Sequence, residues 1–377
     1  MHLPSVASLV LAALPAVMAG KSKDCDSKGL DYYAKKAGLK YFGSATDSPG
    51  QRERAGLEAA YSQYDYIMWK SGEFGQTTPT NGEKKWLFTE PEQGVFNFTE
   101  GEIVTSLAKK NGLILRCHAL VWHSQLAPWV EATNWTADAL REVIVSHITN
   151  VAGHWKGQCY AWDVVNEALN EDGTYRESLF YQVLGEEYIK LAFETAAKVD
   201  PHAKLYYNDY NLEKPSPKTE GAARIVKMLR DAGLKIDGVG LQAHLTAEGH
   251  PTLDQHIDAI AGFTKLGVEV ALTELDIRLQ LPANETNLAQ QKEGYKNIVG
   301  ACVQVEGCIG VTLWDFYDPF SWVPAVFPGE GAAGLWFEDF SKHPAYDGIV
   351  EALTNKTIPE GKGKGKGKGK RRSAYIA

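Results

Sequence analysis

Between Lys40 and Phe316 the chain repeats one pattern, a short run rich in β-branched and aromatic residues followed by a longer stretch with helical periodicity. We predict strands at 40–46, 74–78, 113–118, 160–165, 204–208, 238–242, 268–273 and 309–314. We predict helices between them at 52–68, 100–111, 136–155, 180–199, 217–232, 253–266 and 287–306, and a last one at 344–353. Strands that alternate with helices form parallel sheets, and eight such units predict an α/β fold, a closed (β/α)8 TIM barrel.

The pattern predicts a single catalytic domain at residues 20–354, flanked by two segments of different composition. Residues 1–19 are typical of a secretory signal peptide, with an apolar run followed by small residues before Gly20. The run is too short to span a bilayer and contains Pro15, so no membrane anchor is expected. We therefore expect a secreted, extracellular protein.

Residues 355–377 form a basic tail whose central part, the alternating Gly-Lys repeat at 361–370, has no apolar residues to bury, so the tail is predicted to be disordered. The tail carries a net charge of +7 in a chain whose net charge is −8, which leaves −15 for the remainder. An acidic body argues against nucleic acid as a partner. Three fates of the tail remain open. Its charge could bind the protein to acidic cell-wall polysaccharides, it could be a solvated extension without a role, or a protease could remove it after Arg371-Arg372.

The chain has five cysteines, so at least one stays unpaired. Cys302 and Cys308 lie close in sequence and are the expected disulfide. For Cys117 and Cys159 both a disulfide and two buried thiols remain open, and Cys25 is expected to be free or to lie in a mobile N-terminus. Four Asn-x-Ser/Thr sequons are glycosylation candidates: Asn97, Asn134, Asn284 and Asn355.

The chemistry of a barrel lies where its strands end, because the loops at that face carry the reactive side chains. The fourth predicted strand ends in W-D-V-V-N-E at 162–167, and the seventh ends in T-E-L-D at 273–276. The two strand ends therefore bring Glu167 and Glu274 to the same barrel mouth. A pair of facing carboxylates is the arrangement that glycoside hydrolysis requires.

Two other classes of enzyme are not supported by the sequence. The first predicted strand is not followed by G-x-G-x-x-G, the fingerprint of a dinucleotide-binding domain. The sequence also has no convergent set of histidine and carboxylate ligands for a metal. We expect neither an organic cofactor nor a metal.

Six ordered motifs at strand ends resemble those of glycoside hydrolase family 10, over about residues 30–353. The motifs are R-C-H-A-L-V-W-H at 116–123, W-D-V-V-N-E at 162–167, Y-Y-N-D-Y-N at 206–211, G-L-Q-A-H at 240–244, T-E-L-D at 273–276 and T-L-W-D at 312–315. The resemblance implies a fungal-type secreted endo-1,4-β-xylanase that retains anomeric configuration. It makes Glu167 the general acid/base and Glu274 the nucleophile.

The same resemblance implies how the substrate is held. His244 would orient Glu274 with Asp276 behind it, and Gln242 and His244 would face one way as alternate residues of the sixth strand. One segment departs from the family, because Thr80 replaces an acidic residue and one residue is inserted before Trp86. The implied substrate-binding residues are Asn81, Lys85, His118, Trp122, Asn166, Gln242, His244, Trp314 and Trp322.

The partner implied by these motifs is xylan or another plant cell-wall β-1,4-linked polysaccharide, and a monomer is expected. The change at Thr80 leaves open a second substrate class, a plant glycoside such as a saponin. A non-catalytic sugar-binding protein is a third alternative, although such a protein has no need of both Glu167 and Glu274.

Overall fold

The computed structural model describes residues 28–47 and 61–355. The predicted signal peptide, Cys25, residues 52–60 of the first predicted helix and residues 356–377 of the tail lie outside the described residues.

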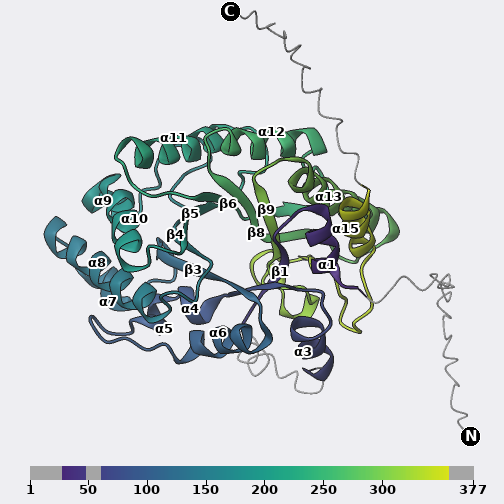
Figure 1. Ribbon diagram of the computed structural model, residues 1–377, viewed down its shortest axis with the longest axis horizontal. Coiled ribbons are helices and arrows are strands. Elements are labelled where there is room, and N and C mark those ends of the chain that lie inside the picture. Colours follow the sequence, from purple (N-terminus) through teal and green to yellow (C-terminus); the bar gives the residue numbers. More distant parts are fainter. Residues whose placement is uncertain (1–27, 48–60, 356–377) are drawn as a thin grey trace, which may run out of the picture.

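Eight parallel strands form a closed barrel, as predicted (Figure 1). Each strand pairs in parallel with its neighbour, and β9 pairs with both β8 and β1 to complete the ring. Two short strands, β7 (His244–Thr246) and β10 (Glu330–Gly331), flank the long β8 outside this ring. The barrel strands are β1 (Tyr41–Thr46), β2 (Gln76–Pro79), β3 (Ile114–Trp122), β4 (Ala161–Asn166), β5 (Lys204–Asp209), β6 (Gly238–Leu241), β8 (Glu269–Gln280) and β9 (Cys308–Leu313).

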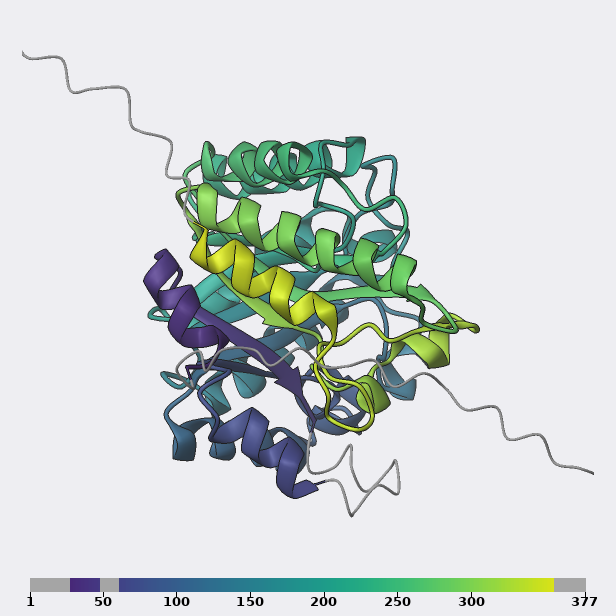
Figure 2. The same ribbon diagram turned by 90° about the vertical axis from the view of Figure 1, so that its right-hand side faces the viewer.

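Helices surround the strands (Figure 1), and α13 and α15 pack side by side (Figure 2). Side chains at Thr136, Ser216 and Thr252 cap the helices that follow them, which explains where these helices begin. The main helices are α1 (Leu30–Ala37), α3 (Tyr61–Trp69), α6 (Thr99–Asn111), α8 (Ala137–His154), α9 (Leu179–Leu184), α10 (Glu187–Val199), α11 (Pro217–Asp231), α12 (Leu253–Thr264), α13 (Glu285–Gln304) and α15 (Pro344–Thr354). Short helices within the loops are α4 (Asn81–Lys84), α5 (Trp86–Thr89), α7 (Pro128–Ala132) and α14 (Val323–Val326).

One stretch predicted as a single helix is interrupted in the structure. The stretch at 180–199 is two helices, α9 and α10, because Gly185 has φ of 57° and ends the first of them. A positive φ is accessible to glycine at low cost, so the chain can turn there without strain.

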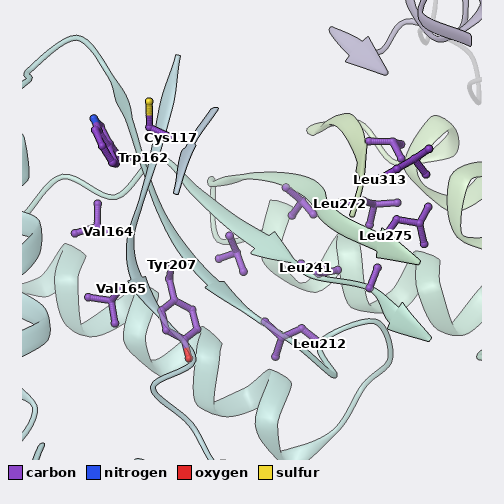
Figure 3. Packing of buried hydrophobic residues seen from close by; sticks show 14 of the residues in the cluster. Cys117, Trp162, Val164, Val165, Tyr207, Leu212, Leu241, Leu272, Leu275 and Leu313 are labelled. Atoms are coloured by element: carbon purple, nitrogen blue, oxygen red, sulfur yellow. The ribbon is translucent and has the colours of Figure 1, made fainter. Parts of the chain in front are cut away.

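The hydrophobic core lies between the strands and the ring of helices. Strand residues such as Trp162, Val164 and Leu241 are buried in it (Figure 3). The interior of the barrel is different, because it contains the ion pair of Arg116 with Asp163, both almost fully buried. Asp163 also contacts His118, so this buried ion pair lies next to a residue of the cleft at the end of the barrel.

Two disulfides hold neighbouring elements together. Cys302–Cys308 joins the end of α13 to β9, which confirms the predicted bridge. Cys117–Cys159 joins β3 to the residues just before β4, which decides the alternative left open by the sequence. Among the described residues no helix has both the length and the apolar character needed to cross a membrane.

Candidate active site

The carboxyl ends of the barrel strands surround a cleft of about 610 Å³. A cleft of this volume is typical of a ligand site. Lys85 does not line it, whereas the other predicted catalytic and substrate-binding residues do: Asn81, His118, Trp122, Asn166, Glu167, Gln242, His244, Glu274, Trp314 and Trp322.

Glu274, on β8, is 5% exposed and surrounded by cationic groups. Burial opposes its ionisation, but the charges of His118, His244 and Lys84 and a hydrogen bond from His244 outweigh burial and lower its pKa to about 2. His244 Nε2 lies 3.3 Å from one carboxylate oxygen, and Asn208 Nδ2 donates to the other at 2.8 Å. Glu274 is therefore ionised and fixed in direction.

His244 lies between two carboxylates, with its Nδ1 3.0 Å from Asp276 Oδ1 on the side away from Glu274. Burial lowers the pKa of His244, but the charges and hydrogen bonds of Asp276 and Glu274 raise it to about 10. Trp322 Nε1 donates to the second oxygen of Asp276 at 2.7 Å. Asp276 thus stands behind His244, the place that the resemblance implies.

His244 lines the cleft beside Gln242, but it does not lie on the same strand, contrary to the sequence prediction. β6 ends at Leu241, and Ala243 has φ of 62°, so Gln242 and His244 are not alternate residues of one strand. A left-handed residue between them turns the chain, and His244 then begins β7. Both side chains still line the cleft.

Glu167 follows β4 and is only partly buried. Its two carboxylate oxygens accept from neutral donors, Trp122 Nε1 at 2.9 Å and Gln242 Nε2 at 3.0 Å. These donors come from β3 and from the end of β6, so three strand ends define one position for this carboxylate.

A chain of side-chain amides connects the two glutamates. The Asn166 amide lies 2.8 Å from that of Asn208 and 3.2 Å from that of Gln242. Gln242 contacts Glu167, and Asn208 contacts Glu274, so the two carboxylates share one network. Gly240 leaves room for it, because a Cβ there would lie 2.1 Å from Asn208 Oδ1.

One wall of the cleft comes from α4. Lys85 was predicted to bind substrate here, but it does not line the cleft. Lys84 lines the cleft, with its Nζ 4.9 Å from the ring centre of Trp122 and 5.1 Å from that of Trp314. Lys85 points elsewhere and lies against Phe88. The residue inserted before Trp86 leaves two adjacent lysines there, and α4, which begins at Asn81, brings Lys84 to the cleft.

Asn81 is oriented by Asp47, which follows β1. The Asp47 carboxylate accepts from Asn81 Nδ2 at 2.8 Å and from the backbone nitrogens of Thr80 and Asn81. Because its amide nitrogen is held this way, the carbonyl oxygen of Asn81 is the end of the amide that can accept a hydrogen bond from a ligand in the cleft.

His118, on β3, connects the cleft to the charged barrel interior. Its Nδ1 lies 3.0 Å from Asp163 Oδ2, and Asp163 is paired with Arg116 below it. Its Nε2 lies 4.0 Å from Glu274 Oε1. His118 also packs edge-on against Trp314.

Sequence reasoning missed several residues at this site. Asn208 and Tyr210 lie within a quoted motif, but no role was assigned to them, although the end of β5 was a signal for both. Arg278 at the cleft rim lies beyond the point where the seventh strand was expected to stop. Within the described ranges one group of potential metal ligands was found, Glu83 with Cys117 and Cys159, whose sulfur atoms are bonded to each other.

Comparisons with known proteins point to one family. The family model for glycosyl hydrolase family 10 matches residues 29–352. Endo-1,4-beta-xylanase A of Humicola insolens is 75% identical over 95% of this chain and 96% of its own length. Endo-1,4-beta-xylanase D of Talaromyces funiculosus is 48% identical over 92% of this chain and 82% of its own length.

Among solved structures, the GH10 xylanase from Bispora sp. MEY-1 with xylobiose is 43% identical and has a TM-score of 0.81. The match covers 86% of this chain and 99% of that one. The family model spans the described structure from α1 into α15 as one domain. The chain therefore belongs to glycosyl hydrolase family 10.

Proposed function

We propose that this protein is a retaining endo-1,4-β-xylanase, with Glu274 as nucleophile and Glu167 as general acid/base. The observation that carries the proposal is the contrast between the two carboxylates in one cleft. Glu274 is buried and held ionised by cations, whereas Glu167 is only partly buried and contacts neutral donors. Two carboxylates with different environments are what a double displacement requires.

In the first step, Glu274 attacks the anomeric carbon while Glu167 gives its proton to the departing glycosidic oxygen. The bond to the leaving sugar breaks as the glycosyl ester forms, and the leaving chain departs with its hydroxyl restored. The charge of Glu274 is consumed in the ester. Glu167 is then an anion.

In the second step, Glu167 removes a proton from water, and the resulting hydroxyl attacks the same carbon from the side that the leaving group vacated. The ester bond breaks and Glu274 is an anion again. Two inversions give net retention. No step requires a group other than the two side chains and water.

Xylan is supported as the substrate by the relatives, which carry the name of endo-1,4-beta-xylanases, and by the aromatic cleft walls. Pyranose rings present apolar C–H faces that pack on flat side chains, and Trp314 and Trp322 line the cleft. The polar side chains of Asn81, Lys84 and His118 line the same cleft and would hydrogen-bond to the sugar hydroxyls. Release of xylo-oligosaccharides from xylan, with no sugar released from a saponin, would separate the two substrate classes.

Stereochemistry tests the mechanism directly. Proton NMR of the first minutes of hydrolysis should show the β anomer of the new reducing end before mutarotation. An α anomer appearing first would exclude the double displacement.

We also propose that the protein is secreted and glycosylated. Two disulfides within a small number of cysteines fit an oxidising compartment. Asn97, Asn134, Asn284 and Asn355 are exposed in the described structure. Mass spectrometry of protein from culture medium, before and after removal of N-glycans, would reveal the mature N-terminus near Gly20 and the occupied sequons, and gel filtration would test the expected monomer.

A further inference from the structure

Four residues without the freedom of glycine adopt positive φ just after barrel strands: Glu167, Asn211, Ala243 and Asp315. For Glu167 the value is 57°. A non-glycine residue in this region costs about 1–3 kcal/mol and persists only where its surroundings hold it. Glu167 is the one among them proposed to transfer a proton, so what holds its backbone is of functional interest.

The backbone around Glu167 is held at three consecutive polar groups. Its own N–H donates to Asn208 O at 2.9 Å. Its carbonyl oxygen accepts from Arg176 Nε at 3.0 Å. The next N–H, that of Ala168, donates to Tyr207 Oη at 3.2 Å. Two of these three partners are side chains, and side chains can be replaced without changing the strand.

Tyr207 is itself fixed in direction. Its hydroxyl accepts from Ala168, so its own proton is free to bond elsewhere, and it donates to Asp209 Oδ2. Asp209 is fully buried and pairs with Lys218 Nζ at 3.1 Å, and Lys218 is also fully buried. The ring of Tyr207 packs within the hydrophobic core (Figure 3). The hydroxyl therefore has one available orientation.

Arg176 is anchored in a similar way. Its Nη2 donates to Leu169 O at 3.3 Å and to Tyr210 Oη at 2.8 Å, while its Nε reaches the carbonyl of Glu167. The guanidinium thus joins the backbone on both sides of the turn that follows β4.

We propose that Arg176 and Tyr207, with Asp209 behind Tyr207, are positioning residues that clamp the strained backbone of Glu167 and thereby aim its carboxylate. The clamp keeps the side chain at Trp122 and Gln242, where its proton faces the glycosidic oxygen. This inference rests on the proposed role of Glu167 as acid/base. Loosening the clamp should impair proton delivery to the leaving group more than the attack by Glu274, because neither Arg176 nor Tyr207 contacts Glu274, which lies on β8 and is held by His244 and Asn208.

Leaving-group dependence separates this role from general stability. Xylotetraose has a poor leaving group that needs the proton, whereas dinitrophenyl β-xylobioside departs with little protonation. A variant that is merely less stable loses active protein for both substrates alike. A variant with a misaimed acid loses activity on xylotetraose alone.

Arg176 offers a matched pair of variants, because the amide nitrogen of glutamine is bonded at the same chain position as arginine Nε. In Arg176→Met the donor to Glu167 is lost, and in Arg176→Gln it is kept, while both variants lose the charge and the contact with Tyr210. We expect Arg176→Met to lower kcat/KM on xylotetraose by about tenfold, the scale of one lost hydrogen bond, and on the aryl substrate by less than about twofold. Arg176→Gln should recover most of the loss.

Tyr207→Phe tests the second contact, with Tyr346→Phe as its control. Each change deletes a hydroxyl that donates to a buried carboxylate, and Tyr346 donates to Glu73, outside the cleft lining, at 2.9 and 3.1 Å. Tyr207→Phe should again penalise xylotetraose selectively, whereas the residual activity of Tyr346→Phe should be the same fraction on both substrates.

Equal losses on both substrates in Arg176→Met, or equal losses in Arg176→Met and Arg176→Gln, would overturn the clamp. Glu167→Ala, measured in parallel, keeps this result apart from the proposed function. If Glu167→Ala is selective for xylotetraose but Arg176→Met is not, the clamp alone is wrong. If Glu167→Ala itself lacks the selectivity, the acid/base assignment is wrong, and the clamp falls with it.

Discussion

On β8, Glu274 is buried among His244, His118 and Lys84, whereas just after β4 Glu167 is only partly buried and accepts from an indole and an amide. The surroundings of Glu274, the proposed nucleophile, act through charge, whereas those of Glu167, the proposed acid/base, act through neutral hydrogen bonds and a held backbone. The same residue type thus has two different environments, which fit the two proposed roles, and each environment can be altered separately.

The largest effect should come from the charged side. Glu274→Ala removes the nucleophile, and we expect kcat to fall by about 10⁵-fold or more, because a covalent mechanism has no substitute for it. Added azide should restore turnover of an activated aryl xylobioside and give a glycosyl azide of inverted configuration, since the vacated space admits a small anion. NMR of the product checks this, and an azide of retained configuration would contradict the assignment.

On the neutral side, Glu167→Ala should lower kcat/KM on xylotetraose by about 10²–10⁴-fold, the usual contribution of a general acid. Activated aryl glycosides should lose far less, because their leaving groups depart without a proton. Steady-state kinetics on both substrates decides the point. Equal losses would mean that Glu167 has a structural role.

A smaller effect is expected at α4, where two adjacent lysines form a natural pair. Lys84→Met removes a cation between Trp122 and Trp314, and KM for xylo-oligosaccharides should rise by about tenfold through the loss of a charged hydrogen-bond donor. Lys85→Met should leave KM unchanged, because Lys85 lies outside the cleft lining. The reverse result would restore the assignment made from the sequence.

The smallest effect concerns pH. His244→Asn removes a charge and a hydrogen bond that lower the pKa of Glu274, so that pKa should rise by about one unit or more. The acidic limb of kcat/KM, which follows ionisation of the nucleophile, should then move to higher pH by the same amount. An unmoved limb would show that His244 does not control Glu274.

Thermal melting gives an independent check of His244. Its pKa is raised from 6.5 to about 10 on folding, so its contribution to the free energy of unfolding is complete below pH 6.5 and is lost as pH rises through about 10. The melting temperature of the wild type should therefore fall more between pH 7 and 10 than that of His244→Asn. Parallel curves would contradict the raised pKa.

The sequence predicted the barrel well because its strands are short apolar runs and its helices carry caps, both of which are local signals. It predicted that Glu167 and Glu274 lie at one barrel mouth, because strand ends are visible along the chain. It chose Lys85 instead of Lys84 as the lysine of the cleft. The residue inserted before Trp86 makes the two lysines equivalent in sequence, and only the start of α4 at Asn81 shows which one faces the cleft. It placed His244 on the sixth strand because a left-handed turn at Ala243 has no signature in an alanine.

Other features depended on distant contacts. The Cys117–Cys159 bond joins residues 42 positions apart, and their proximity follows only from the register of β3 and β4. Asn208 becomes important because Gly240 on the next strand leaves it room. Neither fact can be read from one segment of sequence.

The closure of the barrel by β9 has a consequence for how the chain is made. β9 is the last barrel strand to be synthesised, and it pairs with β8 on one side and with the first strand, β1, on the other. A nascent chain that ends before Cys308 therefore has two unpaired sheet edges, and such edges invite association with other chains. Folding intermediates of this protein should be most prone to aggregate just before β9 leaves the ribosome, and truncations that remove β9 should be recovered as insoluble material.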